Sequence, residues 1–469
     1  MPDVTVTVDA RPGPGGLPRS AELLFRFEAV IHGLYPSLSA FAPASELEKY
    51  KELSSQRSDL TMDLSGDLPT DRKDVWRLTF DGEPGERALL GLLINGQTPV
   101  AAILQGSRVV MIGRLGTENK GIMMLSFEDA LARVITIILA AVSNSEPRSR
   151  LPDLPQLSSE SSSARLDLSR AGKLAAKQLI WTVSRYLYRL CCQTPHWRIG
   201  WRKLDGPDLF ELRRHPEDGW QSLRDDGKRF YADPFPIEIG GSTTLFVEDF
   251  EHKIGKGVIS AVLFGPEGPI GKPVPVLERS YHLSYPFVFE MEGEVWMVPE
   301  SSSARKIELL RATQFPTGWV SEAILVSDVN ASDATLVQHE GRWWMFATVK
   351  DEDGAFSDAL YLWSAPNFRG PWAAHRKNPV LVDIASARPA GRVVSVADQL
   401  LRPAQDCRLG YGASLAIARI ITLDDDYFEQ QVETILRPGP LWAGRKLHTL
   451  NSAGGLEFID GSARAWRWA

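Results

Sequence analysis

The sequence predicts a multidomain protein, in which a small α/β N-terminal domain precedes an all-β five-bladed β-propeller. Three observations predict this: alternating helix and strand patterns in the first third of the chain, a Pro- and Ser-rich stretch after them, and a phrase that recurs five times between Asp233 and His448. A period of about 50 residues filled with short strands is typical of a propeller. We therefore place the domains at 1–145, 146–195 and 196–469.

The N-terminal elements follow from the spacing of apolar residues. Helical spacing predicts a helix over 20–34, with Ser20 as its N-cap. Alternation and apolar runs predict the remaining elements, which in chain order are strands at 59–64 and 75–80, an apolar segment at 88–94, a strand at 109–116 and a helix at 127–142. This order indicates a small α/β layer domain.

Two further segments separate this domain from the repeats. Residues 146–163 are rich in Pro and Ser and are expected to be a linker. Residues 169–192 are amphipathic, with Lys173, Lys177 and Arg189 largely opposite the apolar face. Two interpretations of this helix remain open. It docks the two domains or covers one end of the propeller, or it lies on a membrane surface with its basic side in the headgroups.

The repeated phrase is a polar or Pro-containing step, an apolar strand, a small turn and an aromatic-rich strand. Its five equivalent positions are Asp233, Tyr285, Asp333, Ala390 and His448, in steps of 52, 48, 57 and 58. The innermost strand of each blade lines the central channel of a propeller, and its start lies at one mouth. The repeat starts, including the Ser284-Tyr285 step and Arg388, are therefore expected to meet in one funnel.

A second register follows the first four starts at one constant offset, at Glu248, Glu300, Thr348 and Gln405. Asp233, Glu300 and Asp333, supported by Glu248, form a candidate set of catalytic acids. Glycoside chemistry needs one protonated carboxyl group to donate to the leaving oxygen and one ionised group to activate water or attack carbon. The alternative is that Asp233 and Asp333 only cap the turns at which strands begin.

Other polar residues of the repeats are candidates for substrate binding. Arg388 and Arg402 would hold a carboxylate or phosphate of the ligand, or would neutralise the acids. His282 and His448 would donate to sugar hydroxyls or hold an ion in the channel, with a purely structural role as the alternative. The predicted substrate-binding set is Glu248, His282, Tyr285, Arg388, Arg402, Gln405 and His448.

Composition narrows the class of protein. A net charge of −7 without a basic stripe argues against a nucleic-acid partner. Three cysteines cannot build a disulfide framework, which is typical of a cytoplasmic protein. The longest apolar run, at 134–142, is shorter than the roughly 20 residues that span a bilayer. We find no signal peptide, no zinc signature and no nucleophile elbow, and we predict neither a metal nor a cofactor.

The ADPF step at Ala232 and the acidic repeat starts resemble the five-bladed propellers of arabinanases, xylosidases, invertases and levansucrases. In that clan a first-blade aspartate is base or nucleophile, a second aspartate tunes it, and a glutamate is the general acid. The resemblance implies that Asp233 is the base or nucleophile, that Glu300 or Glu248 is the acid and that Asp333 is the helper. The clan places its second aspartate in blade two and its glutamate in blade three, whereas this order is exchanged here.

A more specific resemblance rests on FVEDF, GKG, YHLSYPFVF, VPES and DATL. These strings resemble the N-terminal propeller of plant glucosamine inositolphosphorylceramide transferases and related bacterial proteins, over about residues 220–448. In the plant proteins a glycosyltransferase domain follows the propeller. This sequence ends at Ala469, so we expect the propeller to do the work itself or to bind for a partner.

The segment 1–145 resembles a formyltransferase-like domain that precedes such propellers, on the strings DLTMDLSG and DVWRLTFDGEPG. No histidine lies in or beside the second string, so we expect a degenerate scaffold.

We predict a carbohydrate-active enzyme that transfers or hydrolyses a glycosyl unit in the funnel. Its expected partners are a sugar or sugar nucleotide and a glycolipid acceptor at the inner membrane face, and its expected place is the cytoplasm. The alternative is a non-catalytic glycan-binding or assembly module of a surface-glycan pathway.

Overall fold

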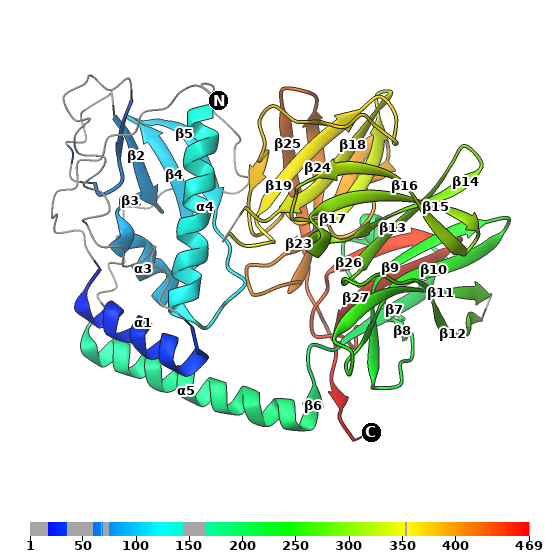
Figure 1. Cartoon of the computed structure of the whole chain (residues 1–469), viewed down its shortest axis with the longest axis horizontal. Helices are drawn as coiled ribbons and strands as arrows, with labels where there is room; N and C mark the ends of the chain where they lie inside the picture. Colours follow the sequence, from blue (N-terminus) through cyan, green and yellow to red (C-terminus); the bar gives the residue numbers. More distant parts are fainter. Residues whose placement is uncertain are drawn as a thin grey trace. The chain divides into compact units, whose positions relative to one another are not determined.

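The computed structural model describes residues 17–34, 60–66, 68, 75–143, 166–265, 267–351 and 354–468. The chain divides into two compact units, residues 1–184 and 185–469. We describe each unit by itself (Figure 1). The linker predicted at 146–163 lies outside the described residues.

The described residues of unit 1 contain a five-stranded sheet in the order β1-β2-β4-β5, with β3 paired to β2. Only the β1–β2 pair of this sheet is parallel. The elements are α1 (Arg19–His32), β1 (Thr61–Asp63), β2 (Val75–Phe80), β3 (Glu83–Pro84), α3 (Glu86–Ile94), β4 (Val100–Gln105), β5 (Arg108–Arg114) and α4 (Met123–Ser143). The sequence patterns at 59–64, 75–80, 109–116 and 127–142 correspond to β1, β2, β5 and α4. The apolar segment at 88–94 belongs to helix α3, and β4 was not predicted.

The start of α1 corrects one prediction. Its N-cap position is Pro18, and Ser20 lies inside the first turn. The Ser20 hydroxyl donates to the backbone oxygen of Leu166 at 2.5 Å. Ser20 therefore connects α1 to the residues that directly precede the helix beginning at Leu168, since Leu166 is distant from Ser20 in sequence.

Helix α5 (Leu168–Cys191) is the longest described helix. Only Ala171 and Gln178 are buried along its 24 residues. No helix in the described ranges is both long and apolar enough to cross a membrane.

Unit 2 is almost entirely β in its described residues. Five sheets of four or five antiparallel strands follow one another along this part of the chain. The first sheet contains β9 (Arg229–Ile239), β10 (Ser242–Glu251), β11 (Lys256–Gly265) and β12 (Gly268–Leu277), and the second contains β13 (Ser284–Met291), β14 (Glu294–Glu300), β15 (Lys306–Gln314) and β16 (Thr317–Ser327). The third sheet contains β17 (Ala331–His339), β18 (Arg342–Val349), β19 (Ala359–Ala365), β20 (Ala373–Ala374) and β21 (Leu381–Val382). The fourth sheet contains β22 (Val394–Val396), β23 (Gln399–Asp406), β24 (Ser414–Leu423) and β25 (Phe428–Leu436).

The fifth sheet joins distant parts of the chain. Its order is β26-β27-β7-β8, so the hairpin of β26 (Thr449–Ala453) and β27 (Leu456–Ser462) pairs through β27 with β7 (Trp197–Lys203), which in turn pairs with β8 (Gln221–Ser222). Strand β7 therefore completes the last sheet, although it precedes all the other sheets of unit 2 in the chain. Short elements flank it: β6 (Cys192–Gln193), α6 (Leu209–Leu212) and β28 (Ala465–Trp466).

The first strands of the sheets lie toward the middle of unit 2. Strand β9 contacts β13 on one side and β26 on the other, and β13 contacts β17. Figure 1 shows β9, β13, β17 and β26 in the middle of this unit, with β12 and β25 at its periphery. Residues at the beginnings of these first strands can therefore meet.

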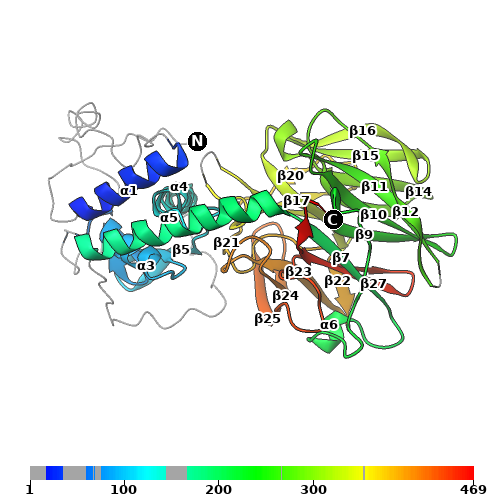
Figure 2. The ribbon, with the colours of Figure 1, turned by 90° about the horizontal axis from the view of Figure 1, so that it is seen from below.

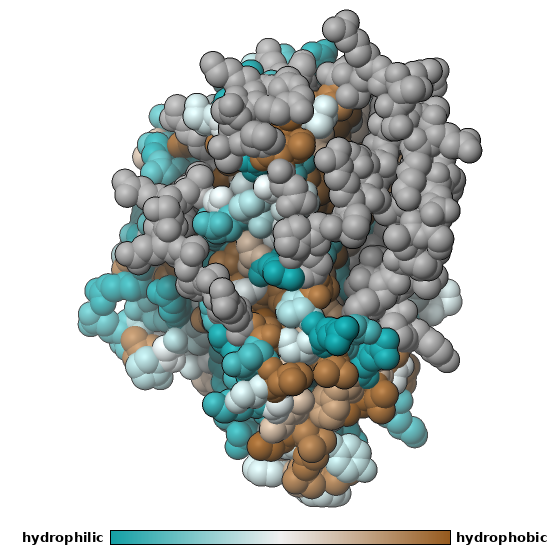
Figure 3. All heavy atoms as spheres, turned by 90° about the vertical axis from the view of Figure 1, so that its left-hand side faces the viewer, coloured by the Kyte–Doolittle hydropathy of each residue, from teal (hydrophilic) through white to brown (hydrophobic). Residues whose placement is uncertain are grey.

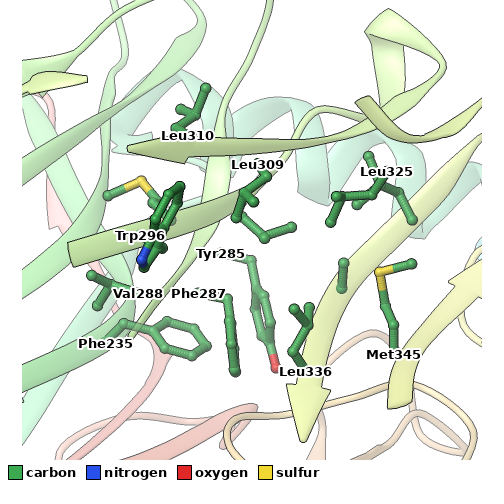
Figure 4. Close-up of a cluster of buried hydrophobic side chains, with 14 of the residues drawn as sticks. Phe235, Tyr285, Phe287, Val288, Trp296, Leu309, Leu310, Leu325, Leu336 and Met345 are labelled. Carbon is green, nitrogen blue, oxygen red and sulfur yellow. The ribbon is translucent and has the colours of Figure 1, made fainter. Parts of the chain in front are cut away.

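Aromatic side chains fill the space between the first three sheets. Phe235, Tyr285 and Phe287 pack with Trp296 and Met345 in one buried cluster (Figure 4). The rings of Phe235 and Tyr285 meet edge to face, with centroids 4.6 Å apart. Such pairs add about 0.5–1.5 kcal/mol to the burial term. The aromatic residues of the repeated phrase thus hold adjacent sheets together.

Candidate functional site

Three of the five repeat starts share an unusual backbone conformation. Asp233, Tyr285 and Asp333 have positive φ angles of 50°, 41° and 58°. Each begins a β-bulge, because the strand register shifts directly after Ala232, Ser284 and Ser332. A bulge puts two residues opposite one and redirects a side chain. The left-handed conformation costs a non-glycine residue about 1–3 kcal/mol, and such residues cluster at functional sites.

The second register lies directly across each hairpin from these bulges. Glu248 pairs with Ala232, Glu300 with Ser284 and Thr348 with Ser332. Gln405 donates its backbone N–H to the oxygen of Arg388 at 2.8 Å. In the first three sheets, the two sets of repeat positions therefore lie on the two paired strands at the same bulge.

One set of side chains, the histidine group, consists of Asp233, His448 and Asp460. Nδ1 of His448 lies 2.5 Å from Oδ1 of Asp460, and Nε2 lies 3.4 Å from Oδ1 of Asp233. Asp460 Oδ2 accepts the backbone N–H of Asp233 at 2.8 Å. Thr449 donates its hydroxyl to Asp233 at 3.2 Å, and Tyr285 donates its backbone N–H at 3.1 Å. Asp233 is thus held by groups from three strands.

A second set, the arginine group, consists of Asp333, Arg388, Glu300 and Gln405. Arg388 donates from Nε to Asp333 Oδ2 at 2.6 Å, and its Nη2 lies 3.8 Å from Glu300 Oε2. Gln405 donates to the same Asp333 oxygen at 3.0 Å. Glu300 accepts the backbone N–H of Asp333 at 3.2 Å. A permanent cation therefore lies between two carboxylates.

Burial raises the pKa values of the acids in both groups. The pKa of Asp233 rises to about 6, although His448 acts in the opposite direction, and Asp460 and Asp333 add to the rise. The pKa of Asp333 rises to about 7 through burial, against the lowering effect of Arg388. Because Asp233 responds to the charge of Asp333, the two groups share one electrostatic environment.

Glu248 lies between the two groups in electrostatic terms. Burial, together with the negative charges of Asp233 and Glu300, raises the pKa of Glu248 well above its ordinary value. The pKa of His448 is also raised: burial lowers it, but the carboxylates of Asp460 and Asp233 outweigh that effect. The site therefore combines a glutamic acid whose pKa is raised by two neighbouring carboxylates with an aspartate whose ionised form is favoured by a histidine.

The accessible side of the site is at Glu248. The His282 side chain is 40 % exposed and its Nε2 lies 3.4 Å from Glu248 Oε1. The side chains of Glu248 and Glu300 each keep 11 % exposure, whereas Asp460 keeps none. Nδ1 of His282 accepts the backbone N–H of Gly257 at 2.9 Å, so the GKG segment fixes this ring. Burial lowers the pKa of His282, which favours its neutral form.

Two predicted binding residues have structural partners instead. The Tyr285 ring is buried in the aromatic cluster, and its hydroxyl lies 2.9 Å from Thr335 Oγ1 and accepts the N–H of Gly391 at 2.7 Å. Figure 4 shows the ring between Phe287 and Leu336. The predicted contact of this side chain with a ligand is therefore replaced by core packing.

Arg402 is also directed away from the acids. Its guanidinium donates to Gln430 at 2.8 and 3.1 Å and to the backbone oxygens of Ser386 and Ala387. Fully engaged and buried, Arg402 holds the segment before Arg388 in place and gives no charge to the site. Arg388 alone of the two predicted arginines joins the acids.

Three residues of the site were not predicted. Asp460 was missed because the β26–β27 hairpin is shorter, so it follows His448 more closely than the constant offset of the other repeats. The Trp197 ring stacks on His448 with centroids 4.3 Å apart. Tyr411 contacts His448 edge to face at 5.4 Å, and the guanidinium of Arg388 lies 4.8 Å from its ring. A strand-end acid in GGLEFIDG signals Asp460, whereas no repeat pattern signals the two aromatics.

The histidine group also has the composition of a metal site. One ligand atom from each of Asp233, His448 and Asp460 lies within 4.8 Å of the others. Two carboxylates and an imidazole suit a divalent cation in principle. In the geometry described here these atoms hold one another, so a metal would displace the contacts between His448 and the two carboxylates.

Sequence comparison identifies relatives of the segment that carries this site. Residues 222–454 match the family described as “Glucosamine inositolphosphorylceramide transferase 1, N-terminal”. This match confirms the resemblance to the N-terminal part of glucosamine inositolphosphorylceramide transferases that the sequence indicated. The chain is 32 % identical over 246 residues to glucosamine inositolphosphorylceramide transferase 1 of Oryza sativa subsp. japonica, covering 50 % of this chain and 33 % of the relative. It is 33 % identical over 222 residues to the Arabidopsis thaliana protein of the same name, covering 46 % and 28 %.

The chain thus spans about a third of the length of these curated relatives. Among solved structures, a thermostable family-43 glycoside hydrolase matches with a TM-score of 0.34 and 15 % identity, over 45 % of this chain and 77 % of the hydrolase. The relatives by sequence are named as transferases with glucosamine in the name. The segment that carries the site is therefore similar to part of proteins named for action on a carbohydrate.

Proposed function

We propose that the five sheets of unit 2 are the blades of a five-bladed β-propeller with a glycosyl-processing site where the first strands begin. The observation that carries this proposal is the position of Asp233 in the bulge directly after Ala232, the residue that pairs with Glu248 across one hairpin. Both acids are buried, and their neighbours differ: His448 lowers the pKa of Asp233, while Asp233 and Glu300 raise the pKa of Glu248. Two carboxyl groups in different protonation states are what cleavage of a glycosidic bond requires.

The roles follow from protonation and access. Glu248, whose raised pKa favours its protonated form, lies beside the exposed His282 ring and donates a proton to the oxygen of the leaving group. Asp233, ionised above about pH 6, accepts the proton of the attacking hydroxyl or water. This assignment selects Glu248 as the acid, where the sequence favoured Glu300. Glu300 and Asp333 then fix Arg388 beside the reacting centre.

His448 and Asp460 support Asp233. The carboxylate of Asp460 stabilises the positive form of His448, and that charge stabilises the ionised form of Asp233. The stacked Trp197 ring limits the orientation of the imidazole. Asp460 is therefore a positioning residue, and Asp233 is the residue that meets the substrate.

We favour transfer over hydrolysis, with a sugar nucleotide as donor and a glycolipid as acceptor. Support comes from the curated relatives, whose names describe transfer involving glucosamine and inositolphosphorylceramide. Hydrolysis by the same two carboxyl groups is the alternative within this proposal, since only the acceptor differs. We also propose a cytoplasmic location, as three cysteines in 469 residues suit a reduced compartment.

The test compares Asp233→Asn and Glu248→Gln with wild type. Turnover of sugar nucleotides and aryl furanosides is measured with and without a lipid acceptor. Loss of the base or the acid reduces turnover about 10²–10⁴-fold. Glu251→Gln is the matched control, because Glu251 lies on the same strand as Glu248 and pairs with Arg229. Equal turnover by wild type and Asp233→Asn would overturn the assignment.

A non-catalytic glycan-binding module is the second candidate. It is favoured by the match to only the N-terminal part of longer relatives. Calorimetry with the same ligands separates the two functions. A binding module binds a sugar with no turnover in wild type, and Glu248→Gln then changes affinity alone.

A further inference from the structure

Helix α5 presents an apolar stripe to solvent. Six apolar side chains between Leu179 and Leu190 are each 48–66 % exposed, namely Leu179, Ile180, Val183, Tyr186, Leu187 and Leu190. At about 100° per residue they fall within an arc of about 120° on the helix surface. Figure 2 shows the helix along its length, and Figure 3 shows apolar (brown) side chains gathered at the lower end of the face that it views. This stripe is far larger than scattered surface leucines explain.

The rest of the α5 surface carries basic residues, together with the exposed side chains of Leu168 and Trp181. The helix carries Arg170, Lys173, Lys177, Arg185 and Arg189, and its 24 residues contain no Asp or Glu. With the same helical angle the basic residues lie on both flanks of the apolar arc and opposite it. The chain as a whole has a net charge of −7, so this positive charge is local.

The C-terminal strand exposes further aromatic side chains beside the end of α5, near Tyr188, which lies about 140° from the middle of the apolar arc. β28 pairs with β6, which directly follows α5, and Arg467 donates its backbone N–H to Cys191 at 2.9 Å. Trp466 and Trp468 are 53 % and 76 % exposed. The guanidinium of Arg464 lies 5.9 Å from the rings of both Tyr188 and Trp466. Tryptophan and arginine of this kind are enriched at the headgroup level of bilayers.

We propose that α5 lies in the plane of an anionic lipid surface, its apolar arc in the acyl boundary and its basic flanks against the headgroups. The charge decides the occupant. A protein partner or a second copy would need acidic groups opposite five cations, whereas an anionic bilayer supplies both the negative surface and the apolar layer. This inference holds for either proposed chemistry, because it concerns attachment and not the glycosidic bond.

The experiment is co-sedimentation of the full chain with vesicles of phosphatidylglycerol and phosphatidylcholine, beside vesicles of phosphatidylcholine alone. We expect binding to the anionic vesicles only, and weaker binding as salt increases. Lys173→Gln with Lys177→Gln weakens it about thirtyfold, since each basic residue at an anionic surface contributes about fivefold. Ile180→Gln with Leu187→Gln weakens it about tenfold or more through lost apolar contact.

The matched control is Ile270→Thr with Val274→Thr, which removes two apolar side chains of 60 % and 59 % exposure from β12. This variant binds vesicles as wild type does. Equal binding to neutral vesicles, or binding that survives both α5 variants, would overturn the proposal. So would a concentration-dependent dimer that Ile180→Gln with Leu187→Gln abolishes, which would make the stripe an interface between copies. Turnover of a soluble sugar substrate is unchanged in the α5 variants, which separates this test from that of Asp233.

Discussion

The two halves of the site, the histidine group and the arginine group, each contain a buried aspartate, but the positive charge beside that aspartate differs between them. In the histidine group, Asp233 faces His448, whose charge depends on pH. In the arginine group, Asp333 faces Arg388, which stays charged throughout. The repeat places both aspartates on equivalent bulges, so the difference comes from their partners. Both aspartates titrate near neutral pH, but only Asp233 has a partner whose own charge changes with pH, whereas the partner of Asp333 keeps a fixed charge. We therefore assign chemistry to Asp233 and support to Asp333.

The largest effect is expected from removing the fixed charge. Arg388→Met leaves Asp333 and Glu300 buried without their cation, so the free energy of unfolding falls by about 3–5 kcal/mol. Urea denaturation measures this change. Arg311→Met is the control, because Arg311 pairs with Glu294 and Glu322 at the surface, where such pairs contribute about 0–1 kcal/mol. Equal losses in the two variants would contradict the role of Arg388.

The pH dependence of stability reports both halves together. Asp233 and Asp333 bind protons more tightly in the folded than in the unfolded state, since their pKa values rise from 3.8 to about 6 and about 7. The folded state therefore holds more protons in this window, and the free energy of unfolding falls by a few kcal/mol from about pH 4 to pH 7. His448, with its raised pKa, acts in the same direction as pH rises.

Thermal unfolding followed across this pH range measures the effect. In Asp233→Asn the decline becomes shallower, because one of the two groups no longer titrates. A stability that rises steadily from pH 4 to pH 7 would show that the acids are not buried as described.

Removing the titratable partner separates the halves directly. His448→Gln deletes the charge that lowers the pKa of Asp233, so the acidic limb of the pH–rate profile moves up by about one unit. The profile of kcat/KM measures it. His215→Gln is the control, since His215 contacts Trp220 and the backbone of Arg437 away from the acids. An unmoved limb in His448→Gln would detach His448 from the base.

The smallest change in stability is expected for Tyr285, the predicted binding residue whose hydroxyl lies in the core. Tyr285→Phe removes the hydroxyl that accepts the N–H of Gly391 and lies 2.9 Å from Thr335. Stability falls by about 1–2 kcal/mol, because a buried donor loses its acceptor. KM stays unchanged in steady-state kinetics, as the hydroxyl belongs to the core. A raised KM with unchanged stability would restore Tyr285 to the binding residues.

The grouping of Asp233, Glu248, Glu300 and Asp333 could be predicted from the sequence, because equivalent positions of repeated sheets lie close together even when they are distant in the chain. It could not separate Arg388 from Arg402, since the direction of each guanidinium depends on the partners around it: Gln430 engages one and Asp333 the other. Asp460 was not predicted because the β26–β27 hairpin is shorter than the others, so Asp460 does not lie at the constant offset from its repeat start. Ser20 was misplaced because its acceptor at Leu166 is distant in sequence.

The fifth sheet sets a time at which this site can form. His448 directly precedes β26, Asp460 lies on β27, and this hairpin pairs with β7, which is made before all of the other four sheets. A chain emerging from the ribosome therefore carries Asp233, Glu248 and Asp333 long before it has the imidazole and carboxylate that control Asp233. A chain that ends ahead of β26 has the strands of the other four sheets, but its β7 lacks the partner β27 and its Asp233 lacks Asp460. Translation of the β26–β27 hairpin thus acts as the step that completes the site.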